Sequence, residues 1–441
     1  MLLEFKTSNY KSFVDEMTFS MIPAAKQTGL DYSVMKEKAG GKTYKGLCSA
    51  VIYGPNASGK SNIIGAMDSF RDIILRGNIN NNEQLKSLDA ALSNLELIPN
   101  CNTSDEKTFF SVKFIDNDLL FEYSLKCDLG PFLSRDYRRS IIEELFSINE
   151  KPVFIREGNE VDVSIPAAVK DYADTIITRI TKKTKEIANN SLSDTELFLV
   201  NGFKTIFSKE LVSRFTDWFQ KKLCVVYRAD SIHSMISEKL FEEGASLVVD
   251  GYTNDAAKEF GLNSEAIGYK RDPKSGDIGL FSVVSKKRNV LVPSELFESF
   301  GTMRFVHEMP LVFKILTSGG TLIIDEFDAS IHPMALMSLI NVFHNDDINK
   351  KHAQLIFNTH NPIFLDSSLF RRDEIKFVEM DDEKRSSVLY SLSDFRTADG
   401  IRKGEDYMKN YFINRYGAIK DIDFSPVFER IMADVQEDEN A

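Results

Sequence analysis

The sequence is poor in cysteine, and its few cysteines lie far apart. Among 441 residues the cysteines are Cys48, Cys101, Cys127 and Cys224, and no two of them form a C-x-x-C pair. This spacing argues against a zinc site and against a disulfide framework, so we expect buried thiols in a reducing, cytoplasmic environment. The single tryptophan, Trp218, falls on the apolar face of an expected helix and is interpreted as a core residue.

Long hydrophobic runs and excess positive charge are also missing. No stretch approaches the roughly 18 apolar residues of a transmembrane helix, and no signal peptide opens the chain, so we expect no membrane contact. The formal net charge is −12, from 54 Lys and Arg against 66 Asp and Glu. A broad basic face for nucleic acid is therefore not expected, although nucleic-acid binding stays open through short basic clusters such as 182–185 and 286–288.

The strongest motif is GPNASGKSN at 54–62, which satisfies the P-loop pattern G-x-x-x-x-G-K-[ST]. An apolar run at 50–53 precedes it and a helix-like stretch at 63–67 follows, as that pattern requires. Inward-pointing N–H groups and the positive end of a helix dipole suit such a loop to nucleotide phosphates. We expect Lys60 to reach the β- and γ-phosphates and the Ser61 hydroxyl to hold Mg²⁺. The residues expected to bind the nucleotide are Gly54, Pro55, Asn56, Ala57, Ser58, Gly59, Lys60, Ser61 and Asn62.

A second motif supplies carboxylates. The apolar run 321–324 ends in Asp325 and Glu326. Asp325 is expected to hold Mg²⁺ directly or through water, and Glu326 to act as general base beside the γ-phosphate. About 265 residues separate Lys60 from Glu326, and this wide split indicates an ATP-binding cassette rather than a compact GTPase.

The sequence Ser-Phe-Gly-Thr stands just before an expected helix at 302–317. A serine and a glycine at a helix N-terminus can form an anion site. In a cassette ATPase this signature binds the γ-phosphate held by the other subunit, so Ser299, Gly301 and Thr302 are candidates for that contact. An ordinary helix N-cap is the alternative. Cassette proteins usually carry Ser-Gly-Gly, so the bulky Phe300 is a departure that bears on how closely the partner subunit approaches.

Two more segments follow the order of a cassette ATPase. Asp328 and Ser330 stand directly after the acidic pair, where these proteins carry the D-loop. His360 ends an expected strand at 354–359 and is expected to contact the γ-phosphate. A Q-loop glutamine is not identified, since its position near 95–103 holds none.

The order of these motifs resembles the cassette ATPases of the SMC, RecF and OLD group. The closer resemblance is to bacterial ATPases typed as "AAA family" in defence loci of the Rlo, abortive-infection L and PARIS kinds. It spans nearly the whole chain and is weakest at 150–280. The segments that carry it are 9–13, 54–62, 298–304, 324–328, 330–333, 353–360, 370–375, 390–395 and 415–419.

The resemblance implies an α/β fold: an ABC ATPase head with a mixed sheet and P-loop core, an antiparallel β subdomain and a helical insertion. It adds Lys11 and Ser12 to the expected ATP site. We expect the N-terminal half of the head, with P-loop and β subdomain, at 1–165. A mostly helical insertion is expected at 166–276, and the C-terminal half, with signature, second acidic motif, D-loop and switch histidine, at 277–441.

The resemblance also implies a function. Two chains would sandwich two ATP molecules with Mg²⁺, as a homodimer or a higher homo-oligomer, and hydrolyse ATP to ADP and phosphate with Lys60, Glu326 and His360 as catalytic residues. Only about 80 residues follow His360, too few for an OLD-type nuclease domain. A sensor or scaffold of an antiphage, abortive-infection system is therefore expected, controlling a separate toxic effector such as a Toprim-type nuclease. The alternatives are a RecF-like DNA-binding ATPase in repair and a non-hydrolysing, ATP-gated interaction module.

Local patterns make further structural predictions. Alternation of apolar and polar residues predicts strands, and apolar spacing of three and four predicts helices. A capping box is expected at 193–196, ahead of a helix, and the acidic tail at 434–440 is expected to fray. The expected strands are two within 2–22 and others at 108–114, 120–125, 152–155, 277–295, 321–325 and 354–359, and the expected helices are at 169–180, 211–219, 302–317 and 333–345.

Overall fold

The computed structural model describes most of the chain. The expected helix at 169–180 lies outside the described residues. The described residues are 1–25, 27–80, 97–103, 106–134, 137–164, 182–227, 251–271, 278–381, 383–395 and 405–440.

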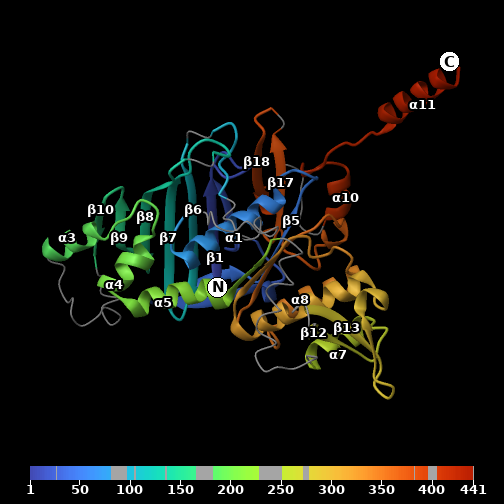
Figure 1. The fold of residues 1–441 in the computed structure, drawn as a ribbon, viewed down its shortest axis with the longest axis horizontal. Coiled ribbons are helices and arrows are strands. Elements are labelled where there is room, and N and C mark those ends of the chain that lie inside the picture. Colours follow the sequence, from blue (N-terminus) through green and yellow to red (C-terminus); the bar gives the residue numbers. More distant parts are fainter. Residues whose placement is uncertain are drawn as a thin grey trace.

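A six-stranded, mostly parallel sheet forms the centre of the molecule (Figure 1). Five neighbouring strands run parallel, and the edge strand β18 is antiparallel to β17. Parallel neighbours place their carboxyl ends at one edge of the sheet, where sites usually form in α/β proteins. The spatial order is β11 (Leu223–Val226), β15 (Thr321–Ile324), β16 (Gln354–Asn358), β5 (Ser49–Tyr53), β17 (Ile375–Asp381) and β18 (Ser386–Ser391).

Alternate residues of these strands point into two different cores. On one face, Ile52, Ile323 and Ile356 pack with helix α1 (Lys60–Arg76) and with the large antiparallel sheet. On the other face, the next residues along each strand pack with helices α8 (Phe300–Ser318) and α9 (Pro333–Phe343). Side chains of a strand alternate between faces, so a sheet covered on both sides must be apolar throughout. This explains why the runs before the two nucleotide motifs are continuous rather than alternating.

A seven-stranded antiparallel sheet lies beyond α1 (Figure 1). The predicted strands of the N-terminal half are confirmed here, while β8 was not predicted. The sheet buries the predicted core residue Trp218, whose ring stacks on Phe114 with centroids 3.9 Å apart. The spatial order is β10 (Glu160–Val163), β9 (Lys151–Glu157), β8 (Ser140–Ile148), β7 (Leu119–Asp128), β6 (Thr108–Asp116), β1 (Leu2–Ser8) and β2 (Met17–Ser20).

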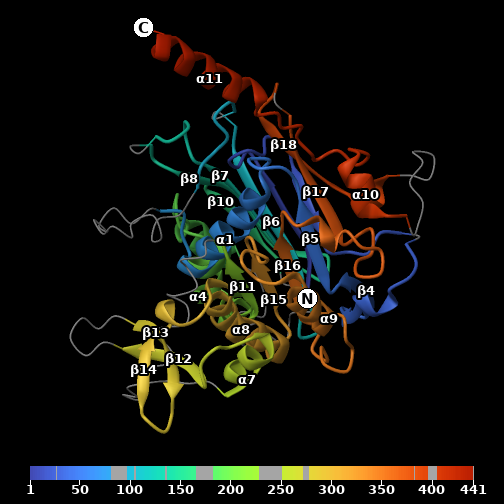
Figure 2. The ribbon, with the colours of Figure 1, turned by 90° about the vertical axis from the view of Figure 1, so that its right-hand side faces the viewer.

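The remaining elements attach to these two sheets. The hairpin β3–β4 follows the N-terminal strands, and a three-stranded sheet with α7 stands beside α8 (Figure 2). Within 166–276, expected as a mostly helical insertion, β11 joins the central sheet and β12 the small one. The helices not yet given are α3 (Lys182–Asn190), α4 (Lys204–Ile206), α5 (Lys209–Asp217), α7 (Gly251–Phe260), α10 (Tyr407–Phe412) and α11 (Ser425–Asn440), with π-helical turns at Phe198–Phe203 and Trp218–Lys222 and 3-10 turns at Asp31–Ser33, Ser294–Leu296, Pro362–Phe364 and Leu392–Asp394. The remaining strands are β3 (Val34–Ala39), β4 (Lys42–Leu47), β12 (Ala266–Arg271), β13 (Ile278–Ser285) and β14 (Val290–Pro293).

Three local predictions were wrong. No capping box forms at 193–196, because Ser193 Oγ accepts from Thr195 N, and the π-helical turn that follows has Leu197 at its N-cap with no side-chain hydrogen bond. Cys101 is exposed, although the other three cysteines are buried as expected. The acidic tail is helical as far as Asn440 rather than frayed.

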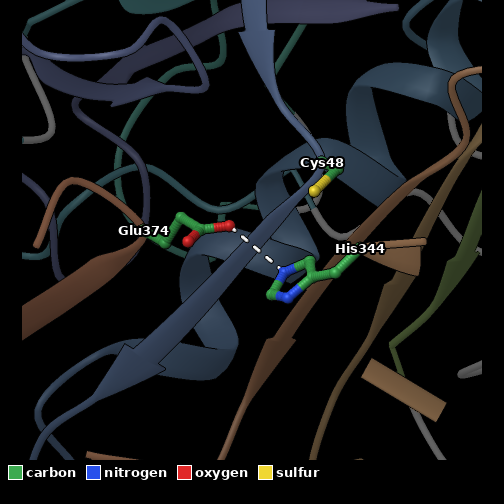
Figure 3. A group of neighbouring side chains, drawn as sticks. All are labelled: Cys48, His344 and Glu374. Atoms are coloured by element: carbon green, nitrogen blue, oxygen red, sulfur yellow. Dashed lines mark ion pairs between the residues drawn. The ribbon is translucent and has the colours of Figure 1, made fainter. Parts of the chain in front are cut away.

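The amino ends of β5 and β17 are joined by a buried polar cluster (Figure 3). Cys48, His344 and Glu374 bring potential metal-ligand atoms within 4.8 Å of one another. Ser49 Oγ donates to Glu374 Oε1 at 2.7 Å and lies 2.8 Å from His344 Nε2, so the serine already bridges the acid and the imidazole. We therefore interpret this cluster as a hydrogen-bonded junction that holds the two strands in register.

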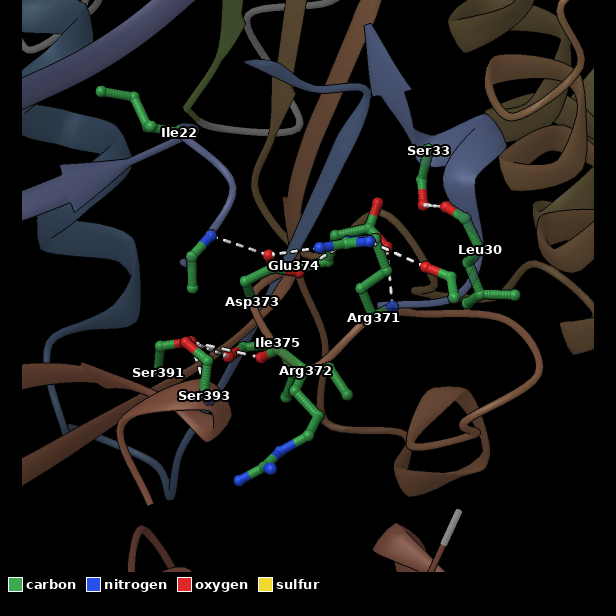
Figure 4. Close-up of polar contacts among 12 residues, drawn as sticks. Ile22, Leu30, Ser33, Arg371, Arg372, Asp373, Glu374, Ile375, Ser391 and Ser393 are labelled. Atoms are coloured by element: carbon green, nitrogen blue, oxygen red, sulfur yellow. Dashed lines mark hydrogen bonds and ion pairs between the residues drawn. The ribbon is translucent and has the colours of Figure 1, made fainter. Parts of the chain in front are cut away.

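The 370–375 segment, one of those that carry the family resemblance, has a structural role (Figure 4). The Arg371 guanidinium forms two 2.9 Å hydrogen bonds to the buried Asp373 carboxylate and donates a third to Gly29 O at 2.7 Å. Asp373 also accepts from the backbone N–H of Ala24. Because each group is paired, this buried ion pair anchors the loop after β2 to the start of β17.

Candidate functional site

The P-loop connects β5 to α1 at the carboxyl edge of the central sheet. Gly59 precedes the helix with φ of 106°. An added Cβ there would lie 2.4 Å from Ser387 Oγ and 2.7 Å from Ser12 Oγ, so this position needs glycine for both reasons. Gly54, Ser58 and Lys60 are buried, while Asn56 and Ala57 at the tip of the loop are exposed. The tip of the loop is therefore exposed, while its two ends are packed against the protein, and the end at Gly59 contacts Ser12 and Ser387.

Lys60 is folded over the P-loop. Its Nζ donates to Gly54 O at 2.8 Å and to Pro55 O at 2.9 Å. Burial lowers the pKa of this amine to about 8, against the opposing effect of Asp325 and Glu326. Because burial is what disfavours the charged amine, an anion placed at the loop would stabilise its charged form.

Ser61, Asp325 and Asn358 form one hydrogen-bonded group, although 264 positions separate the first two. Ser61 Oγ donates to Asp325 Oδ1 at 3.0 Å, and Asn358 Nδ2 donates to the same oxygen. Burial raises the pKa of Asp325, while these two hydrogen bonds act in the opposite direction. A hydroxyl and a carboxylate held this way are oxygen ligands of the type that Mg²⁺ prefers, so the donor set fits that ion.

The backbone at Glu326 is held in an unusual conformation. Its φ of 52° lies in the left-handed region, which is uncommon for a residue with a side chain. The Glu326 N–H donates to Asn358 Oδ1, and its carbonyl accepts from Arg304 Nη2 at 2.6 Å. Strain of this kind concentrates at functional positions, where the surrounding contacts fix it. Glu326 is exposed and follows the end of β15, so these contacts fix its backbone at the edge of the sheet.

Of the turn residues Lys11 and Ser12, Ser12 contacts the P-loop, whereas the Lys11 amine contacts Tyr227. Ser12 Oγ accepts from Asn62 Nδ2 and from Ser387 Oγ, each at 2.7 Å, and Ser387 Oγ is also 2.6 Å from Ser58 O. Lys11 Nζ donates to Tyr227 Oη at 2.9 Å and lies over that ring. The turn after β1 and the edge strand β18 thus support the loop from one side.

The signature segment caps α8. Ser299 is the N-cap, and its Oγ accepts from Thr302 N at 3.0 Å. Gly301 packs against the D-loop so closely that a Cβ would lie 2.1 Å from Ser330 O. Phe300 is 69% exposed, beside the exposed Leu296. Within one chain, therefore, Ser299 acts as an ordinary helix N-cap.

His360 and Asp328 lie at the same edge of the sheet. Asp328 Oδ2 accepts from Thr359 Oγ1 at 2.7 Å, which ties the D-loop to the end of β16. His360 is only partly covered by its neighbours, and this partial desolvation and the Lys60 charge lower its pKa. The imidazole is thus favoured in its neutral form at pH 7.

The structure brings together the P-loop, the acidic pair and the 358–360 segment, because β5, β15 and β16 are adjacent and parallel. The signature residues contact the D-loop and, through Arg304, the carbonyl of Glu326. Sequence reasoning gave no role to Asn358, Arg304, Ser387 or Tyr227. Asn358 and Arg304 belong to motifs that carry the family resemblance, and this membership is the sequence signal that could have identified them. Within 97–103, the described part of the expected Q-loop position, the Asn100 side chain donates to Lys11 O, and no Q-loop residue is assigned.

The comparison with protein families gives the identification. Residues 49–366 match the model of a family described as "AAA domain, putative AbiEii toxin, Type IV TA system". The chain belongs to this family. The match extends over more than half of the chain and includes every motif of the site except the 9–13 turn. It confirms the expectation of an AAA-type ATPase of the abortive-infection kind.

Three solved structures of SMC heads are similar to this chain. Each is 14% identical to it, with a TM-score of 0.36. The first is the SMC head domain from Thermotoga maritima, and the match covers 88% of this chain and 98% of that structure. The second is an SMC head bound to the C-winged helix domain of ScpA, with 91% of this chain and 99% of that structure covered. The third is an Smc head with an extended coiled coil bound to the C-terminal domain of ScpA from Pyrococcus furiosus, with 88% of this chain and 96% of that structure covered. No curated protein matches the chain. Within the described parts of the chain, no helix has the length and apolar character needed to cross a membrane.

Proposed function

We propose that the chain binds ATP with Mg²⁺, hydrolyses it to ADP and phosphate, and uses this cycle to control a separate effector in an abortive-infection system. The Ser61–Asp325–Asn358 group carries the proposal, because it places an oxygen donor pair between the P-loop and the acidic strand end. Mg²⁺ held there would neutralise phosphate charge. The remaining groups need only position ATP and water, since phosphoryl transfer depends mainly on positioning and charge stabilisation.

Each residue has a proposed part. Backbone N–H groups of 54–62 and Lys60 bind the phosphates. Glu326 accepts a proton from the attacking water, and its backbone is fixed by Asn358 and Arg304. His360, neutral at pH 7, donates a hydrogen bond to the γ-phosphate.

We infer that the active form is a homodimer in which each signature meets the nucleotide of the other chain. Ser299 and Phe300 at the start of α8 are exposed, as is Leu296, whereas Gly301 and Thr302 behind them are buried. Exposed apolar side chains at a polar site are a common feature of protein interfaces. Arg304 connects this helix to the carbonyl of Glu326, so closure on one nucleotide is coupled to the general base of the same chain. The domain limits 1–165, 166–276 and 277–441 are kept as proposed units of the head.

A trapped state provides the test. Glu326→Gln is expected to bind Mg-ATP, to lose hydrolysis and to accumulate as a closed dimer. Glu259→Gln, an exposed change on α7, is the matched control and should behave as wild type. Steady-state phosphate release and light scattering behind size-exclusion chromatography measure the two properties. Wild-type hydrolysis by Glu326→Gln would show that the general base is assigned wrongly.

The effector is identified with the same variant. Tagged Glu326→Gln protein is purified with Mg-ATP from its native host, and the bound material is analysed by mass spectrometry and nucleic-acid staining. A stoichiometric toxic protein, such as a nuclease, supports the proposed control of an effector. Recovery of DNA without such a protein would instead support the second candidate, a RecF-like DNA-binding ATPase. The net charge of −12 disfavours that candidate.

A further inference from the structure

The C-terminal helix α11 leaves the head and exposes an apolar face. Figures 1 and 2 both show α11 projecting from the body, beyond α10 and β18. No described segment of the chain covers this face. Its members, with their exposed fractions, are Phe424 (65%), the residue just before the helix begins, and Val427 (44%), Phe428 (63%), Ile431 (49%), Met432 (57%) and Val435 (44%) within it.

We propose that α11 pairs antiparallel with α11 of a second copy of this chain, about a two-fold axis. The spacing of the six residues places them on one side of the helix, as in helices that pack against another helix. Phe424, Phe428 and Met432 also line a shallow surface together with Ser425, Glu429 and Ala433. A two-fold contact uses the same patch on both copies, so the patch must match itself.

The order of side chains along α11 meets that requirement. The apolar positions are symmetric about the peptide between Glu429 and Arg430. If two antiparallel helices cross at this peptide, each apolar residue faces one apolar residue of the other copy. We call each facing pair a layer; there are three kinds of layer, and each joins a bulkier side chain to a smaller one. Alternation of large and small residues across facing positions gives close packing. The layers pair Phe424 with Val435, Phe428 with Ile431, and Met432 with Val427 of the other copy.

Other occupants fit less well. In a parallel pair, Phe424 would face Phe424 and Phe428 would face Phe428, and the acidic last turns would lie side by side. An anionic membrane surface would be repelled, because the helix sequence has Arg430 as its one basic residue against acids at 429, 434, 437, 438 and 439. Antiparallel pairing keeps the acidic ends apart.

Self-association of the full chain without nucleotide is the test, since the proposed ATP sandwich does not form under that condition. Sedimentation velocity over a range of concentrations should show a reversible dimer. Phe428→Asp/Ile431→Asp is expected to weaken it at least about tenfold, because two apolar layers are lost. Ile187→Asp on α3, which changes an isoleucine of similar exposure (48%), should leave the dimer intact. Circular dichroism confirms that each variant is folded.

A layer exchange tests the register. Phe424 of each copy faces Val435 of the other, so this pair occurs twice in the dimer. Phe424→Val or Val435→Phe alone changes both occurrences and should weaken the dimer. The double variant restores Phe opposite Val in each copy and should recover most of the affinity. Additive losses in the double variant would overturn the antiparallel register.

A wild-type chain that stays monomeric at every concentration, or a dimer insensitive to Phe428→Asp/Ile431→Asp, would overturn the proposal itself. Binding of α11 to phosphatidylserine vesicles without self-association would do so as well. Because this contact uses none of the residues proposed to bind or hydrolyse ATP, failure here leaves the proposed ATPase untouched. If both contacts form, two different two-fold interfaces on one chain link dimers into a larger assembly.

Discussion

Asn358 is predicted to set the affinity of the site for Mg²⁺ without binding the ion. Its amide donates to Asp325 Oδ1 and accepts from Glu326 N–H, so it fixes both acidic residues. Asn358→Leu removes both contacts at nearly constant volume. A hydrogen bond to a charged group contributes about 1.5–3 kcal/mol, and partners that orient metal ligands typically change metal affinity about 10- to 100-fold. We expect a loss of that size in the Mg²⁺ activation constant of the ATPase.

The sign of the pH dependence follows from Asp325. Burial already raises the pKa of this carboxyl, and Asn358 opposes that shift. Loss of the amide should raise the pKa further, so that protons compete with Mg²⁺ at higher pH. The acid limb of the Mg²⁺-dependent rate should therefore move toward neutrality in Asn358→Leu.

Steady-state ATPase rates, measured against Mg²⁺ concentration at several pH values, provide the assay. Asn349→Leu is the matched control: Asn349 is also buried, and its side chain bonds the backbone of Phe343 and Ala353, away from the site. That variant should lower Tm while leaving the Mg²⁺ constant of the folded protein unchanged. An unaltered Mg²⁺ constant in Asn358→Leu would refute the reasoning.

Three further predictions concern Lys60, Gly301 and Ser49. ATP binding above pH 8 should take up protons, because the Lys60 pKa of about 8 must rise beside phosphate, and below pH 7 the uptake should vanish; calorimetry in two buffers of different ionisation enthalpy measures it. Gly301→Ala should lower Tm by an amount equivalent to about 1–3 kcal/mol, since its Cβ would meet Ser330 O at 2.1 Å, and an unchanged Tm would contradict that packing. Ser49→Ala should cost about 1–3 kcal/mol in urea unfolding, because the buried Glu374 loses its hydroxyl donor, whereas Ser49→Thr, which keeps the hydroxyl, should cost less.

The nucleotide motifs could be predicted because their chemistry is local. A P-loop works through its own backbone and the helix that follows, so 54–62 is readable without its surroundings. The same holds for the apolar run before Asp325, since a strand buried on both faces has to be apolar. Elements without such a signature were missed or misplaced. β8 is interrupted by charged residues, and the Ser-x-x-Glu pattern at 193–196 forms other hydrogen bonds.

By itself, the sequence determined the class of the site: which residues can hold phosphate, which carboxylates stand at a strand end, and in what order the motifs come. Only the tertiary structure decided which side chains support them. Asn358, Arg304 and Ser387 lie far along the chain from the groups they contact, and no local pattern encodes such a contact. The exposed face of α11 is likewise a tertiary result, because an amphipathic pattern predicts a buried face whether or not its own chain covers it.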